Sequence, residues 1–340
     1  MEQCLVTGGA GYVGSHFCKA LANAGFLPVT VDNLSRGHEE AVKWGPLLKG
    51  DIRDGAFLDR VFHEHWPIRC VFHFAALAYV GESVEKPNLY YDNNFCGAKS
   101  LLDAMLRAAP HGEPVPPIVF SSTCATYGVP QTDTISESHP QWPINPYGWS
   151  KLFVERMLND YSEAYGLRFA ALRYFNACGA DEDGEIGELH EPETHLIPLV
   201  LRAAKTHSAV KVFGTNYPTP DGSAIRDYVH VSDLADAHVL AMEHLLGGSM
   251  SMKKLILNLG TGRGYSVREV VEEARRVTGA DFGVVDAPPR QGDPPKLVAS
   301  SGLAESVLGW RPKRSSLRNV IETAWRFERG RGNGSQFPQS

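Results

Sequence analysis

The sequence predicts an α/β fold in which a Rossmann-type, doubly wound parallel sheet is joined to a smaller mixed α/β domain. Through the first half of the chain, short apolar runs alternate with segments of helical periodicity, which is typical of a parallel sheet flanked by helices. The first run passes directly into a glycine-rich turn, and the alternation stops after Ala177. We therefore expect one domain over residues 1–178, with residues 225–246 roughly returning to it, and a second, interleaved domain over residues 179–330.

Five apolar runs are the predicted strands of the sheet, and they cover residues 4–7, 29–31, 69–74, 118–120 and 169–172. Segments between them carry apolar residues at helical spacing, so we expect helices over residues 12–24, 56–65, 88–109 and 146–165. In a sheet of this kind, ligands bind beyond the carboxyl ends of the strands. Residues that follow these strands are therefore the first candidates for a functional site.

In the second half of the chain, apolar runs and helical segments no longer alternate regularly. Residues 179–193 are polar, acidic and glycine-bearing, which predicts a loop or an excursion from the first domain. A helix over residues 196–205, a strand over residues 210–213 and a turn-rich stretch over residues 217–222 follow. A further strand and helix are expected between residues 228 and 246. These elements predict a smaller domain over the edge of the sheet.

Composition and charge exclude several classes of protein. The chain has 340 residues, of which 43% are hydrophobic and 21% charged, as in an ordinary globular protein. Its net charge is −6, and its Lys and Arg residues are scattered, so nucleic acid is not an expected partner. No apolar run reaches the ~18 residues of a membrane span. We therefore expect a soluble, cytoplasmic protein without a membrane partner.

The cysteines indicate neither a metal site nor a disulfide framework. No C-x-x-C pair and no zinc-like spacing occurs among the six residues Cys4, Cys18, Cys70, Cys96, Cys124 and Cys178. We expect them to be small buried residues in a reducing compartment, and we expect no metal.

The turn after the first strand predicts a dinucleotide site. Gly8 would allow the tight turn, Gly11 would let the backbone approach a pyrophosphate, and Gly14 would let the helix pack closely on the strand. The N–H groups at the start of the helix, around Tyr12 and Val13, would meet the phosphates. The alternative is that these glycines only serve a turn.

A carboxylate in the right place supports this interpretation and selects the cofactor. Asp32 ends the second predicted strand about 20 residues further on, where it would accept hydrogen bonds from the adenosine ribose. It would also repel a 2′-phosphate, so we expect NAD and not NADP. Asp51 and Ile52 suit the adenine pocket, although an Asp at a strand end can also be an ordinary helix cap.

Tyr147 and Lys151 are the predicted catalytic pair. They lie four residues apart, so both side chains share one face if this stretch is helical. A nearby ammonium and a positive nicotinamide ring would lower the pKa of the phenol towards neutral, where general acid–base catalysis is most effective. A Tyr and a Lys at this spacing are by themselves more often surface residues. Thr123 follows the predicted strand over residues 118–120, where its hydroxyl would lie beside the tyrosine or cap the turn.

With these motifs the chain resembles the UDP-galactose 4-epimerase family of extended short-chain dehydrogenases/reductases, and most of all its bacterial exopolysaccharide-associated branch. The plant UDP-xylose (arabinose) 4-epimerases are also similar. The resemblance covers nearly the whole chain and rests on residues 8–16, 32–34, 50–54, 73–76, 80–83, 91–94, 147–151, 172–176, 226–231, 258–262 and 308–310. Together these segments are highly specific for the family.

The resemblance implies a reaction and a role for each residue of the site. Tyr147 would remove the proton of the sugar's 4-hydroxyl while NAD takes the hydride from carbon 4, with Thr123 and Lys151 assisting. The 4-keto sugar would then turn in the pocket and take the hydride back on its other face. The implied cofactor contacts are Gly8, Gly11, Tyr12, Val13, Gly14, Asp32, Asn33, Asp51, Ile52, Phe74, Ala75, Asn93, Lys151 and Phe175. The implied substrate contacts are Thr123, Tyr147, Asn176, Leu196, Phe213, Arg226, Arg290 and Asp293.

The chain departs from the family pattern at four positions. Thr123 stands where many members have Ser, and it keeps the hydroxyl. Ala78 stands where a Lys often reaches the cofactor, and His195 replaces a common Asn. Leu297 lies where some members carry a Tyr that crowds the 2-substituent of the sugar, so N-acetylated sugars could be admitted.

The sequence also leaves alternative substrates and functions open. UDP-glucose/UDP-galactose is the expected substrate pair, with UDP-xylose/UDP-arabinose or UDP-N-acetylhexosamines as alternatives. A nucleotide-sugar dehydratase would need an Asp-Glu pair after Thr123, where Cys124 and Ala125 stand. An NAD-sensing regulatory protein on the same fold would lack the catalytic Tyr or Lys. The resemblance also implies a homodimer that pairs through helices 88–109 and 146–165.

Overall fold

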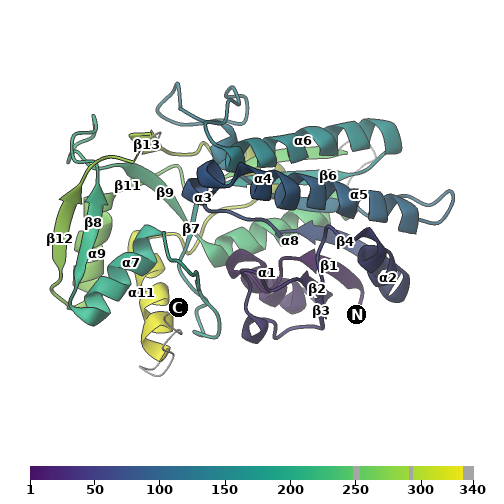
Figure 1. Ribbon diagram of the computed structural model, residues 1–340, viewed down its shortest axis with the longest axis horizontal. Helices are drawn as coiled ribbons and strands as arrows, with labels where there is room; N and C mark the ends of the chain where they lie inside the picture. The colour runs from purple at the N-terminus through teal and green to yellow at the C-terminus, as the bar shows by residue number, and fades with distance from the viewer. Residues whose placement is uncertain (248–252, 291–293, 332–340) are drawn as a thin grey trace.

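A seven-stranded parallel sheet forms the centre of one half of the molecule (Figure 1). The computed structural model describes residues 1–247, 253–290 and 294–331. The strands lie in the order β10-β6-β5-β4-β1-β2-β3, and every neighbouring pair is parallel. They are β1 (Gln3–Thr7), β2 (Leu27–Asp32), β3 (Leu47–Lys49), β4 (Ile68–His73), β5 (Ile118–Thr123), β6 (Phe169–Tyr174) and β10 (Lys254–Leu259). This arrangement confirms the predicted Rossmann-type fold.

Helices cover both faces of the sheet, which explains why its strands are apolar without alternation. One layer holds α1 (Tyr12–Asn23), α8 (Val231–Gly247) and α10 (Gly302–Leu308), and the other holds α2 (Gly55–His65), α5 (Gly97–Ala108) and α6 (Pro146–Tyr165). Within β1, Cys4 and Val6 pack in the first layer and Leu5 in the second, because successive strand residues point to opposite faces. Phe17 of α1 is fully buried, and such burial stabilises a fold by about 1.5–3 kcal/mol per side chain.

The predicted helix over residues 88–109 is interrupted. It consists of α4 (Pro87–Tyr90), a π-helical turn η2 (Tyr91–Cys96) and α5, and it follows α3 (Val80–Glu85). Within the π-helical turn, the buried side chain of Asn94 donates to the carbonyl of Leu77 and to Ser150 Oγ and accepts from the amide of Leu77. The wider turn therefore lies where Asn94 holds the loop after β4 against α6.

Segments from the second half of the chain build two smaller sheets and their helices at the other end of the molecule (Figure 1). β9 (Ile225–His230) pairs with β7 (Asn176–Cys178), β11 (Gly264–Ser266) and β13 (Lys296–Leu297), and β8 (Ala209–Phe213) pairs with β12 (Gly283–Ala287). Helices α7 (Leu196–Thr206), α9 (Val267–Thr278) and α11 (Leu317–Gly330) share a separate apolar core. Single-turn 3-10 helices lie at η1 (Glu39–Ala41) and η3 (Cys124–Thr126).

The chain crosses between the two halves more often than the sequence suggests. β9 belongs to the smaller half, α8 packs against α1, and β10 completes the seven-stranded sheet beside β6. The elements that return to the main sheet are thus α8, β10 and α10. The domain limits at residue 178 and at residues 225–246 stay predictions.

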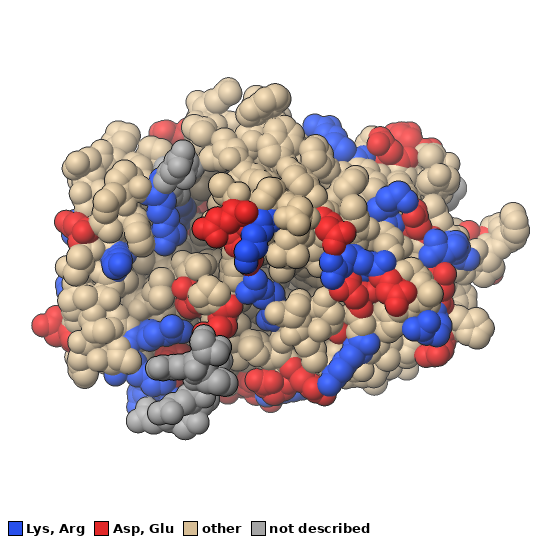
Figure 2. Space-filling model, viewed as in Figure 1, with Lys and Arg blue, Asp and Glu red and all other residues tan. Residues whose placement is uncertain are grey.

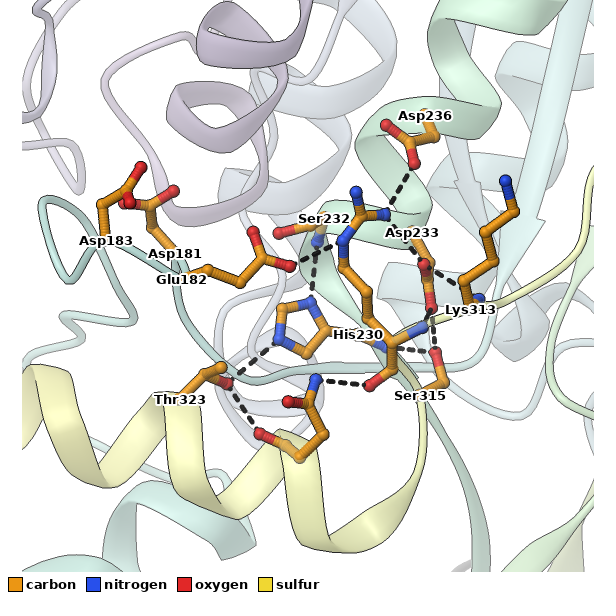
Figure 3. A network of polar contacts seen from close by, with 12 residues as sticks. Asp181, Glu182, Asp183, His230, Ser232, Asp233, Asp236, Lys313, Ser315 and Thr323 are labelled. Atoms are coloured by element: carbon orange, nitrogen blue, oxygen red, sulfur yellow. Dashed lines mark hydrogen bonds and ion pairs between the residues drawn. The ribbon is translucent and has the colours of Figure 1, made fainter.

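A buried carboxylate ties the C-terminal segment to α8 (Figure 3). Asp233 is 1% exposed and accepts hydrogen bonds from the amides of Lys313 and Arg314 and from Ser315 Oγ, 2.6–3.1 Å away. Next to it, His230 Nε2 lies 3.0 Å from Thr323 Oγ1 of α11. Because a buried acceptor must be satisfied, this network fixes where α11 lies against the end of β9.

The cysteines form no disulfide. All six are free thiols, and those of Cys4, Cys18, Cys70 and Cys178 are buried. Among the described residues, no helix combines the length and the apolar character needed to cross a bilayer. In the view of Figure 2, Lys and Arg alternate with Asp and Glu over the surface and gather in no large patch of one sign.

Candidate active site

One cavity of about 1830 Å³ lies where both halves of the molecule meet, beyond the carboxyl ends of the parallel strands. Drug-sized ligands occupy pockets of roughly 300–1,000 Å³, so this cavity has room for two ligands at once. The predicted cofactor residues that line it are Gly8, Gly11, Tyr12, Val13, Gly14, Asp32, Asn33, Ile52, Phe74, Ala75, Asn93, Lys151 and Phe175. The predicted substrate residues that line it are Thr123, Tyr147, Asn176, Leu196, Phe213, Arg226 and Arg290.

The three glycines of the motif that joins β1 to α1 are needed for different physical reasons. Gly8 has a φ of 75°, and a Cβ there would lie 2.4 Å from the nitrogen of Ala75. A Cβ on Gly14 would lie 2.1 Å from the carbonyl oxygen of Gly8. At Gly11 the only such neighbour is that same oxygen, at 3.3 Å. The protein's own packing therefore requires Gly8 and Gly14, whereas Gly11 leaves a space that faces the cavity.

The start of α1 offers unpaired N–H groups to an anion. Gly11 is the N-cap residue and has no side chain to cap the helix, and no acidic residue lies in the first turn. Such a helix end carries a positive partial charge, which makes it a site for phosphate groups. Gly11, Tyr12 and Val13 all line the cavity here.

Asp32 lies at the end of β2 in the cavity wall. Its Oδ2 accepts from the amide of Ala10 at 3.1 Å and its Oδ1 from the amide of Leu34 at 2.8 Å. Burial raises the pKa of this carboxyl, and the two backbone hydrogen bonds oppose that shift. These contacts hold the side chain firmly in position.

Asp51 does not line the cavity, in contrast to its neighbour Ile52. Its carboxylate is held by the guanidinium of Arg53 at 2.7 Å and by Asn33 Nδ2 at 2.9 Å. Hydrogen bonds from Arg53 hold the pKa of Asp51 well below its usual range. Asp54, and not Asp51, caps α2, because its side chain accepts from the amide of Phe57.

Helix α6 brings Tyr147 and Lys151 into the same wall of the cavity. The helix begins after Asn145, whose side chain accepts from the amide of Gly148 at 2.8 Å. Lys151 is 3% exposed, and its Nζ donates to the carbonyl of Ser121 in β5 at 2.9 Å. Tyr147, Lys151 and Thr123 thus meet at the carboxyl ends of the central strands.

Burial dominates the electrostatics of this pair. Burial raises the pKa of Tyr147 well above that of a free phenol, Tyr174 adds to the increase, and contact with Thr123 opposes it. Burial lowers the pKa of Lys151 to about 7, and the charge of Glu155 opposes this. The predicted lowering of the phenol's pKa depends on a charged Lys151 and on a bound, positively charged nicotinamide ring, and it stays a prediction.

The smaller half forms the side of the cavity where the substrate contacts are predicted. Arg226 is 9% exposed at β9, and the guanidinium of Arg290 lies 4.3 Å from the ring centre of Phe213. Two guanidinium groups in one wall provide forked donors for a diphosphate. Leu297 also lines the cavity. The predicted contact Asp293 lies outside the described residues.

Several residues of the wall were not predicted as site residues from the sequence. Segment 179–193 was expected to be a loop, and its residues Glu188, His190 and Glu193 line the cavity together with His195. Tyr174 at the end of β6 is a further lining residue, and its hydroxyl lies 2.6 Å from Ser121 Oγ. The alternation of Glu and His in residues 188–195 was the signal that could have revealed the first group.

Comparison with known proteins decides the family. Residues 4–259 match the model of the NAD dependent epimerase/dehydratase family. This chain belongs to that family. Within the epimerase/dehydratase family, it is similar to the UDP-glucose 4-epimerase of Rhizobium meliloti (strain 1021), with 51% identity over 331 residues that cover 97% of this chain and 98% of the relative.

Solved structures of the family have the same fold. The UDP-glucose 4-epimerase of Brucella ovis in complex with NAD superposes with a TM-score of 0.89 and is 51% identical, covering 96% of this chain and 98% of its own. The enzyme of Stenotrophomonas maltophila, with bound NAD and formylated UDP-arabinopyranose, has a TM-score of 0.90 at 38% identity, covering 97% and 98%. These likenesses extend over both halves of the molecule.

Proposed function

We propose that this chain is a UDP-sugar 4-epimerase that uses NAD, with UDP-glucose and UDP-galactose as its main substrates. The observation that carries the proposal is that Tyr147, Lys151 and Thr123 share one cavity with the glycine turn and with two arginines of the smaller half. The family match and the similarity to UDP-glucose 4-epimerases over nearly the whole chain support the same activity.

The residues around the glycine turn fit NAD. The space beside Gly11 and the uncapped start of α1 suit a pyrophosphate, and the buried carboxylate of Asp32 suits the ribose hydroxyls of an unphosphorylated adenosine. Phe74, Ala75 and Phe175 offer apolar wall to the rest of the dinucleotide. When bound, NAD supplies the hydride acceptor that inversion of carbon 4 needs.

Tyr147 is the proposed base for the 4-hydroxyl of the sugar. Because burial raises its pKa, the phenol stays protonated until a positive charge lies beside it. Lys151 lies on the same helix face and supplies one such charge when it is protonated. An oxidised, positively charged cofactor would add another, so the base would become active only in the loaded enzyme. Thr123 is placed to hold the reacting oxygen.

The smaller half is proposed to hold the UDP group. Arg226 and Arg290 would bind the diphosphate, and Asn176, Leu196 and Phe213 would line the path to the sugar. The choice of sugar is the finer part of this proposal. Glucose and galactose, their N-acetyl forms and xylose/arabinose differ by one substituent each, which a pocket separates by only ~1–3 kcal/mol. The aliphatic Leu297 leaves the N-acetyl forms as the second candidates.

Product analysis tests the proposal. Purified protein is incubated with UDP-galactose, and the products are separated while NADH is followed by its absorbance. A 4-epimerase gives UDP-glucose of unchanged mass without net NADH. A product lighter by one water would instead indicate a dehydratase, and no turnover of any UDP-sugar would indicate an NAD-binding regulator. The same assay with UDP-N-acetylglucosamine and UDP-xylose ranks the candidate sugars by kcat/KM.

A homodimer that pairs through residues 88–109 and through α6 belongs to the same proposal. The aromatic rings of Tyr91, Phe95 and Trp149 lie 5.6–6.1 Å from that of Phe153, which is 40% exposed on α6. An exposed aromatic group of this kind supports an interface with a second copy. Light scattering after gel filtration should give twice the mass of the chain, and Phe153→Glu should give the monomer. A monomeric wild type contradicts this part.

We also propose that the protein works in the cytoplasm. The free thiols of Cys4, Cys18, Cys70 and Cys178, all buried in the two cores, support a reducing compartment. Fractionation of its native cells with an antibody against the chain tests this.

A further inference from the structure

Two histidines and two glutamates form a compact group in the wall of the cavity. They are Glu188, His190, Glu193 and His195, from the segment that leads into α7. One potential ligand atom from each residue lies within 4.8 Å of all the others. The side chains of Glu188 and Glu193 are only 6% and 2% exposed, so their charges are largely shielded from water. Two buried carboxylates at one point need a positive charge between them.

The spacing of these atoms suits a metal ion. Glu188 Oε1 lies 3.1 Å from His190 Nδ1, and the two oxygens of Glu193 lie 3.8 Å from His190 Nδ1 and 3.9 Å from His195 Nδ1. Glu188 Oε1 also contacts His195 Nδ1. Four ligands at the ~2.0–2.2 Å bond lengths of zinc stand about 3.3–3.6 Å apart in a tetrahedron. The observed separations bracket that value.

The imidazoles are oriented towards this point by their surroundings. The ring of His190 meets those of Tyr12 and Tyr79 edge to face, with centroids 6.3 and 5.6 Å away. Its buried Nδ1 has no hydrogen-bond partner among the described residues, because Glu188 lies outside hydrogen-bond geometry. Glu193 Oε1 accepts from the amides of Thr194 and His195 at 2.7 and 2.8 Å. Such second contacts hold a carboxylate in place for a metal.

A second acidic group already has its charge neutralised by a lysine. Asp181, Asp183 and Glu185 also come together, but the ammonium of Lys19 lies 2.7–2.9 Å from all three. In the described part of the chain, neither Glu188 nor Glu193 forms an ion pair with a lysine or arginine. The group around Glu188 and Glu193 therefore has four potential ligand atoms but, among the described residues, no ion pair with a lysine or arginine.

The alternative is that both imidazoles are protonated and neutralise the carboxylates themselves. This would place two positive rings with their centroids 5.2 Å apart. It would also leave the proton on Nδ1 of His190 without an aligned acceptor. A divalent ion satisfies all four side chains with one charge centre, and imidazole with carboxylate suits a first-row transition ion such as Zn²⁺.

We propose that Glu188, His190, Glu193 and His195 form a binding site for a divalent transition-metal ion, best matched by Zn²⁺. The site lies between Tyr12, the first residue of α1, and Leu196, the first residue of α7. The bound ion fixes the 188–195 segment as the wall that joins the two sides of the cavity. It also cancels two negative charges beside a cavity that accepts anionic ligands. The site stands independently of the proposed epimerase activity.

Zinc titration of the full-length protein tests the proposal. After dialysis against EDTA, Zn²⁺ is titrated in competition with a chromophoric chelator, and Co²⁺ is added to a second sample for its visible spectrum. The expected result is one Zn²⁺ per chain, a rise in Tm with Zn²⁺, and the strong visible bands of four-coordinate Co²⁺.

Matched variants locate the ion. Glu193→Gln is nearly isosteric, and His195→Gln changes a side chain that is 45% exposed, so both should fold in EDTA as judged by circular dichroism. Each should bind Zn²⁺ more than ~100-fold more weakly, since even second contacts are worth 10–100-fold. His63→Gln, on the exposed face of α2, should bind as the wild type does. Wild-type protein without stoichiometric Zn²⁺, or both ligand variants with unchanged affinity, would overturn the site.

Discussion

Lys151 is almost completely buried, and it faces the cavity beside the proposed base. Replacement with Met removes the ammonium but keeps the length of the side chain. We expect kcat to fall by about 10²–10³, within the range for loss of acid–base assistance, and the alkaline rise of kcat to move to higher pH. The reason is that the phenolate of Tyr147 loses a neighbouring positive charge and forms less readily.

A pH profile of kcat with UDP-galactose checks this. Lys99→Met provides the control, because Lys99 pairs with Asp103 on the exposed side of α5 and should leave the profile unchanged. A Lys151→Met profile that falls in rate without any shift along the pH axis would contradict the electrostatic role.

At the residue scale, the sequence predicted the position of a functional side chain where the motif is local. Tyr147 and Lys151 share a helix face because they lie four residues apart on α6. The environment of each group depends on distant segments, and the burial that raises the pKa of Tyr147 in the chain alone was not predictable from the motif. Asp51 shows the same limit, because its ion pair with Arg53 and its absence from the cavity lining follow from side-chain packing.

The glycine turn gives a prediction at the scale of an element. In Gly11→Ala, the new methyl meets only the carbonyl oxygen of Gly8 at 3.3 Å, so the protein should fold but lose at least tenfold in NAD affinity. In Gly14→Ala, the methyl would lie 2.1 Å from that oxygen, so α1 must shift away from β1. Such overpacking costs about 1–3 kcal/mol.

Calorimetric NAD titration and chemical unfolding separate the two variants. Gly11→Ala should retain the wild-type unfolding midpoint, and Gly14→Ala should unfold at lower denaturant. If Gly11→Ala binds NAD as tightly as the wild type, the pyrophosphate does not lie at this turn.

Turns and helices were predictable where a single segment of the sequence contains the whole pattern that specifies them. The turn between β1 and α1 follows from three glycines, and α6 from a helical periodicity after Pro146. The π-helical turn at Tyr91–Cys96 was not, because it depends on the contact of Asn94 with α6 and with the loop after β4. β10 was missed as a sheet strand because it pairs with β6 only after a long excursion through the smaller half.

Buried histidines should make the folded state of the whole molecule less stable in acid. Burial lowers the pKa of His16 and His238 to about 4 and that of His73 and His230 to about 3. An unfolded histidine titrates near 6.5. Between these values the unfolded chain binds protons that the folded chain does not. Their contribution to stability is therefore complete above about pH 6.5 and is lost as the pH falls towards 4 and 3.

His238→Gln removes one of these groups and should flatten the dependence of unfolding free energy on pH. His238 lies on α8 against Phe17, Phe74 and Tyr174 in the main core. Urea unfolding at pH 7, 6 and 5 measures the slope, with the exposed His63→Gln as the control. A slope equal to that of the wild type would show that this histidine does not stay neutral in the folded protein.

At the same scale, the sequence predicted the class of fold but not how often the chain crosses between its halves. Alternation of apolar runs and helical segments is a local signal, and it indicated a parallel sheet. The return of α8 and β10 to that sheet depends on contacts between residues far apart, such as Leu257 with Leu172. The same long-range folding brings Arg226 and Arg290 to the cavity that the first half opens.

Turnover of UDP-galactose by Tyr147→Phe, compared with the wild type at equal NAD occupancy, is the decisive measurement. Loss of a single hydroxyl should lower kcat by about 10² or more while the protein keeps its fold and its NAD, because the proton of the 4-hydroxyl then has no acceptor. A Tyr147→Phe variant that still interconverts UDP-galactose and UDP-glucose at the wild-type rate would contradict the assignment of the base and the mechanism built on it.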